Sequence, residues 1–89
     1  MSSGMLNRGD VIWLVGEILQ ADIQIRGGNK DRYVAGRRVA LAATACRLLR
    51  IARPGLDRYM TWVSEQVESR GRRIGDLEEP GAWIRKNPA

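Results

Sequence analysis

Residues 40–63 read ALAATACRLLRIARPGLDRYMTWV, a stretch that predicts two helices joined by a tight corner. The corner is the tetrapeptide Arg50-Ile51-Ala52-Arg53. Pro54 suits the first turn of the second helix, because its missing N–H costs nothing there and its φ is already helical. Helical spacing then places one apolar face on Leu56, Tyr59, Met60, Val63 and Val67.

Two helical segments flank this corner on its N-terminal side. Asp10 is expected to cap the first, whose apolar residues recur at helical spacing. That stripe comprises Val11, Ile12, Leu14, Val15, Ile18, Leu19 and Ile23. Gly27-Gly28-Asn29 predicts its end, and Asp31 predicts the cap of a second helix that runs to about Leu49. The small residues 39–46 of that helix predict its packing surface, in which Cys46 is a small hydrophobe.

The C-terminal segment predicts one more short helix. Glu78 and Glu79 precede Pro80, and Arg85 and Lys86 follow, which is the polarity that a helix dipole favours. Trp83 and Ile84 would hold this helix against the body. The sequence therefore predicts one all-α domain over residues 1–89, with three main helices, a short C-terminal helix and a flexible segment at residues 1–9.

Charge is concentrated in the middle of this 89-residue chain. The net charge is +5, yet residues 26–58 contain nine basic and two acidic side chains, a net +7. Thirteen of the fifteen basic residues are arginine, whose planar fork suits phosphates and guanine edges. This pattern favours a polyanionic partner. The alternative is an arginine-rich composition inherited from a GC-rich genome.

The absence of histidine and the single cysteine exclude several kinds of site. Cysteine–histidine zinc fingers, serine triads and cysteine–histidine dyads cannot form. Carboxylate catalysis is not excluded, but no two acids lie in an apolar setting that would separate their pKa values. We expect no enzymatic activity, no cofactor and no metal. The longest apolar run is too short to span a membrane, so a cytoplasmic location is expected.

The stretch 45–60 resembles the helix-turn-helix of many bacterial regulators and recombination factors. That pattern has a small residue in its first helix, apolar residues before and within the turn, and a basic-proline step that opens the recognition helix. Those places are filled by Cys46, Leu48-Leu49, Ile51 and Arg53-Pro54, with Leu56 and Tyr59 as anchors. The chain departs from the pattern at Arg50, which would need the left-handed conformation usual for glycine, at Ala52, which cannot cap, and at Gly55 within the helix.

The resemblance implies binding of double-stranded DNA by the helix that begins near Pro54. Arg53, Asp57, Arg58 and Thr61 would project from it, the two arginines toward guanine edges or phosphates and Asp57 toward a cytosine amino group. The DNA backbone would be held by Arg37, Arg38, Arg47 and Arg50. Arg85 is expected to contribute less than Arg53 and Arg58. The alternative is a plain corner between two helices with a solvated basic edge.

Residues 79–86 are similar to the proline–glycine–aromatic–aliphatic–basic tail that follows the helix-turn-helix in some plasmid and phage replication proteins. This similarity implies a regulator, or a replication or recombination factor, of a mobile element. A small chain also favours a homodimer, which would bury more surface. The rival hypothesis is a helical adaptor or inhibitor that binds a larger protein through Trp13, Trp62 and Trp83, since tryptophan and arginine are frequent at binding hot spots.

Overall fold

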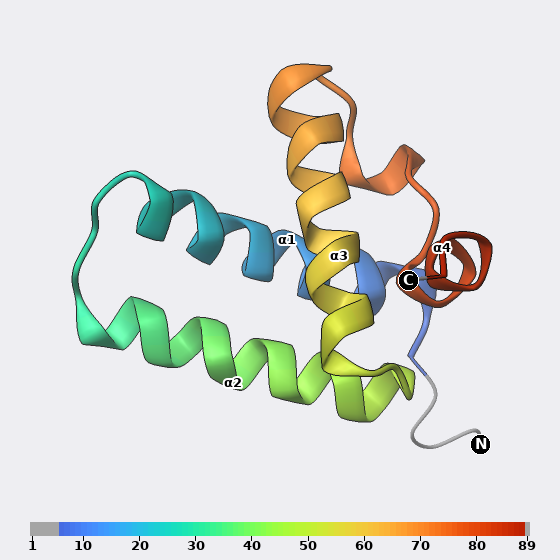
Figure 1. Cartoon of the computed structure of the whole chain (residues 1–89), viewed down its shortest axis with the longest axis horizontal. Helices are drawn as coiled ribbons and strands as arrows, with labels where there is room; N and C mark the ends of the chain where they lie inside the picture. The colour runs from blue at the N-terminus through green and yellow to red at the C-terminus, as the bar shows by residue number, and fades with distance from the viewer. Residues whose placement is uncertain (1–5, 89) are drawn as a thin grey trace.

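The computed structural model describes residues 6–88, and every regular element within them is helical. The order is α1 (Arg8–Arg26), α2 (Arg32–Leu49), α3 (Arg53–Ser64), a π-helical turn (Glu65–Ser69), a 3₁₀ turn (Ile74–Asp76) and α4 (Pro80–Lys86). Helices α1 and α2 lie side by side and antiparallel, while α3 crosses them steeply and α4 packs beside the beginning of α3 (Figure 1). The predicted all-α bundle of three main helices and a short fourth is confirmed.

The first helix begins earlier than the sequence predicted. Asn7 is its N-cap, and its side chain accepts a hydrogen bond from the Asp10 amide at 2.8 Å. The Asp10 carboxylate in turn accepts from the Asn7 amide, so the two residues form a capping box. The prediction of Asp10 as the cap is therefore wrong, as is that of a flexible segment reaching residue 9. Residues 1–5 of that segment lie outside the described part of the chain.

The apolar face of α1 forms one wall of the core. Most of the predicted stripe is buried, and Ile18 is completely so. Ile12 is only half-buried, and Ile23 is 42 % exposed while the nearby Ala21 is buried. The stripe therefore ends before the last turn of α1, where the chain approaches the loop that contains Gly28 with φ +95°.

The small residues of α2 allow α1 and α3 to approach closely. Ala42 and Ala45 are its two buried residues, with exposed fractions of 0 % and 1 %. Cys46 is half-buried and packs against the core. Val39 is exposed, so the predicted packing surface is narrower than residues 39–46.

The predicted apolar face of α3 fills the centre of the molecule. Leu56, Tyr59, Met60 and Val63 are all buried. The Tyr59 hydroxyl donates a hydrogen bond to the carbonyl oxygen of Glu78 at 2.6 Å, which fixes the segment before α4. Burial is the main reason that the pKa of this phenol lies above its usual value.

The corner between α2 and α3 has the left-handed residue that the sequence led us to expect at Arg50. Arg50 adopts φ 55° and ψ 49°, the left-handed conformation, and its amide donates to the carbonyl oxygen of Cys46. Ala52 is the N-cap of α3 and supplies no side-chain hydrogen bond. Gly55 is buried, and a Cβ atom there would lie 3.2 Å from Cδ1 of Ile84. This glycine is therefore explained by the close approach of α4.

We predict that relief of the left-handed conformation at Arg50 stabilises the fold. Arg50→Gly and Arg50→Ala both remove the side chain, but only glycine adopts positive φ without a Cβ penalty. We expect the glycine variant to exceed the alanine variant in unfolding free energy by about 1 kcal/mol. Urea denaturation at unchanged m-value would measure this difference. Equal stability of the two variants would contradict the left-handed corner.

Candidate functional site

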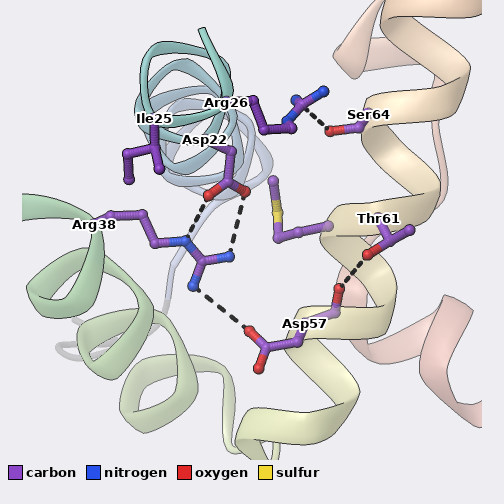
Figure 2. Close-up of a pocket in the computed structure, with 8 residues that line it drawn as sticks. Asp22, Ile25, Arg26, Arg38, Asp57, Thr61 and Ser64 are labelled. Carbon is purple, nitrogen blue, oxygen red and sulfur yellow. Dashed lines mark hydrogen bonds and ion pairs between the residues drawn. The ribbon is translucent and has the colours of Figure 1, made fainter. Parts of the chain in front are cut away.

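Arg38 is the centre of a polar network where the three main helices meet. Its Nε and Nη2 atoms donate to the carboxylate of Asp22 at 2.8 and 3.3 Å. Its Nη1 atom lies 3.5 Å from Oδ1 of Asp57. Figure 2 shows the guanidinium of α2 between the acid of α1 and the acid of α3. The hydrogen bond with Asp22 is the main cause that raises the pKa of Arg38.

These residues line an interhelical groove of about 360 Å³. Its other polar residues also have partners within the protein. Oδ1 of Asp57 lies 3.4 Å from Nε of Arg53, and the Thr61 hydroxyl donates to the Asp57 carbonyl oxygen at 3.1 Å. Both aspartates of the groove are therefore paired with arginines of the same domain, and neither carboxylate is left without a cation.

Arg26 closes the far end of the interhelical groove. Its Nη2 atom donates to Glu68 at 2.7 Å and to the Ser64 hydroxyl at 3.1 Å (Figure 2 shows the contact with Ser64). The hydrogen bond from Arg26 is the largest cause of the lowered pKa of Glu68. This contact joins the end of α1 to the π-helical turn. Sequence reasoning missed it, because the partners are more than forty positions apart along the chain.

The predicted DNA-binding residues thus fall into two groups. Arg38, Asp57 and Thr61 take part in the network, and Arg53 joins it through Asp57. Arg37 forms an ion pair with Glu17 of α1. These side chains are held by protein partners, and a role for them in binding DNA stays a prediction.

The remaining three arginines lie at or beside the corner. Arg47 and Arg50 are exposed, and neither forms an ion pair with a carboxylate among residues 6–88. Arg58 is half-buried, and its Nη2 atom donates to the carbonyl oxygen of Asn87 at 3.3 Å. Their positive charge is therefore not neutralised within the described part of the protein.

A second groove, which we name the corner groove, opens beside these arginines. It has a volume of about 380 Å³ and lies between the corner, the first turns of α3, and α4. Arg50, Arg58 and Arg85 line it together with apolar and glycine residues, and no acidic residue lines it. Arg85 was not among the predicted site residues. It directly follows the predicted anchors Trp83 and Ile84, but nothing in the sequence signalled that α4 would bring it to the corner.

The three tryptophans differ in their contacts and their exposure. Trp62 and Trp83 stack with ring centroids 5.4 Å apart, and both also contact Tyr59. Both are half-buried. Trp13 is 58 % exposed on α1 and makes no aromatic contact within the described residues. A binding role for the three tryptophans stays a prediction.

The described part of the chain offers no obvious metal site, since no three cysteine, aspartate or glutamate side chains gather in residues 6–88. No helix in this range combines the length and the apolar character needed to cross a membrane. No protein-family model, curated protein or solved structure matches the chain.

We predict that the Arg38 network is a structural feature. Arg38→Met keeps the length of the side chain but leaves Asp22 and Asp57 without their shared cation. Because Arg38→Met removes two charge-assisted hydrogen bonds, it should lower the unfolding free energy by about 2 kcal/mol. Adding Asp22→Asn should recover about half of this loss, because one stranded charge is removed.

Arg37→Met is the matched control in the same helix. The Arg37–Glu17 pair is more exposed, with side chains 36 % and 24 % accessible, so its loss should cost less than about 1 kcal/mol. Chemical denaturation would compare the variants. An equal loss for Arg37→Met and Arg38→Met would show that Arg38 has no special structural role.

Proposed function

We propose that this protein binds double-stranded DNA through the beginning of α3 and the corner that precedes it. The observation that carries the proposal is the set of arginines at this end without a carboxylate partner: Arg47, Arg50 and Arg58. They lie beside a three-residue turn between two steeply crossing helices (Figure 1). In helix-turn-helix proteins, the N-terminal residues of the second helix are the ones that contact base edges.

The charge along α3 supports contact by its first turns only. Arg53 and Arg58 lie in this part of the helix, whereas the exposed Glu65 and Glu68 follow at its far end. Glu68 is bound by Arg26 and Glu65 lies 3.9 Å from Arg70, so the charges at that end are paired, unlike those at the corner. We therefore propose an approach in which the N-terminal end of α3 points into the major groove and its C-terminal end lies away from the duplex.

The proposal includes a biological context. The resemblance of residues 45–60 and of the tail at residues 79–86 supports a transcriptional regulator, or a replication or recombination factor, of a plasmid or phage. A cytoplasmic location and a homodimer are part of the same proposal.

We predict strongly salt-dependent binding to duplex DNA. Fluorescence anisotropy with labelled random-sequence duplex and single strand, measured across a salt series, tests this directly. About four phosphate contacts would give a slope of log K against log salt near −4. Arg53→Gln and Arg47→Gln should each weaken duplex binding by about tenfold.

Arg32→Gln is the matched control for this experiment. Arg32 is an exposed arginine of α2 at the opposite end from the corner, so its loss should leave affinity nearly unchanged. Absence of duplex binding near physiological salt would refute the proposal. Equal weakening by all three substitutions would indicate diffuse charge instead of a defined contact surface.

The second candidate function is an adaptor or inhibitor that binds a larger protein. One observation favours it: Trp13 is 58 % exposed and Ile23 is 42 % exposed along the same shallow depression of α1. An exposed tryptophan beside apolar side chains is typical of an interaction hot spot. Trp62 and Trp83, which the sequence also suggested for this role, are half-buried and stack on each other.

We predict that, if this second function applies, Trp13 carries it. Pull-down from a nuclease-treated lysate of the source organism would retain a defined partner on the wild-type protein, and Trp13→Ala would lose it. Tyr33→Ala is the control, since Tyr33 is an even more exposed aromatic residue on α2. Loss of the partner by both variants, or by neither, would argue against the surface around Trp13.

A further inference from the structure

The corner groove differs in charge from the interhelical groove on the other side of α3. The interhelical groove contains two arginines and two aspartates, and these pair within the protein. The corner groove contains three arginines and no acid among its lining residues. The two grooves have nearly equal volumes, so the contrast is one of charge and not of size.

The three arginines of the corner groove come from three separate elements. Arg50 is the turn residue between α2 and α3, Arg58 belongs to α3 and Arg85 to α4. Three guanidinium groups that share one groove repel one another unless an anion lies between them. Arginine from several directions is also the usual way in which proteins surround a phosphate, because each fork donates two hydrogen bonds.

The local contacts position two of these arginines without neutralising their charge. The contact of Arg58 with the Asn87 carbonyl oxygen at 3.3 Å fixes its side chain but adds no negative charge. Ile84 packs against Gly55, which sets α4 against α3 and brings Arg85 to the groove. The packing of α4 against α3 thus completes the positive charge of the corner groove, because it brings Arg85 there.

We propose that the corner groove binds a single phosphate group, with Arg50, Arg58 and Arg85 as its ligands. A phosphate site here adds α4 to the binding surface. The proposal rests on the DNA-binding function only for the source of the phosphate. That source is either the backbone of a nucleic acid strand or a free phosphorylated compound. The groove is open to solvent and large enough for a phosphate together with part of the group that carries it.

The first arm of the test detects the phosphate site without DNA. The full-length, ¹⁵N-labelled protein is titrated with inorganic phosphate, and with sodium chloride at matched ionic strength. The amides of Gly55 and Gly81, which line the groove, report binding. We expect saturable shifts with phosphate only, about tenfold weaker binding in Arg85→Gln, and unchanged binding in Arg32→Gln.

The second arm identifies the source of the phosphate from the salt dependence of duplex binding. If a DNA strand supplies it, Arg85→Gln should reduce the magnitude of the slope by about 1, and Arg32→Gln should not. An unchanged slope together with intact phosphate binding in the first arm assigns the groove to a free phosphorylated compound. If the wild-type protein does not bind duplex, the proposed function fails while saturable phosphate binding still supports the groove.

The inference is overturned by a definite result in the first arm. Shifts at Gly55 and Gly81 that are absent, that appear equally with chloride, or that persist unchanged in Arg85→Gln would each show that the groove is no phosphate site. Arg50→Gln provides an independent check, since it removes a second ligand from a different element. Circular dichroism of each variant would confirm that its helices are intact.

Discussion

One guanidinium group holds the three main helices of this protein at their meeting point. Arg38 of α2 binds Asp22 of α1 through two hydrogen bonds and lies within ion-pair distance of Asp57 of α3. Arginine keeps its charge at any accessible pH, and its planar fork fixes orientation as well as distance. The steep crossing of α3 over α1 and α2, and therefore the outward position of the corner, depends on this junction together with the core beneath it.

The charged side chains differ between the two grooves that flank α3. On one side the basic residues are neutralised by acids of neighbouring helices, so the net +7 of residues 26–58 overstates the charge that a partner meets. On the other side Arg50, Arg58 and Arg85 meet no acid in their shared groove. A basic sequence has thus folded into a domain with one strongly positive end.

The local features of the fold were predictable from sequence, and the pairing of its charges was not. Helix positions follow from apolar periodicity and from helix-breaking residues. The left-handed conformation of Arg50 was expected only from the helix-turn-helix resemblance, which places Arg50 where that pattern usually has glycine. The predicted start of α1 was too late because asparagine and aspartate are both favoured N-caps, and Asp10 was chosen. In the structure Asn7 is the cap, and Asp10 is its partner in the capping box. The partner of Arg38 depends on how α2 is rotated against α1, which no local pattern specifies. For the same reason Arg85 gave no sign that it would lie beside the corner.

The contact between Gly55 and Ile84 makes the last helix a dependent element of the fold. A helix of seven residues is far too short to be stable alone in water, so α4 exists only while it is docked against α3. We expect its amides to exchange with solvent through a local opening that leaves the rest of the bundle folded. Each opening would withdraw Arg85 from the corner, and the positive end of the molecule would weaken and recover on the timescale of that fluctuation.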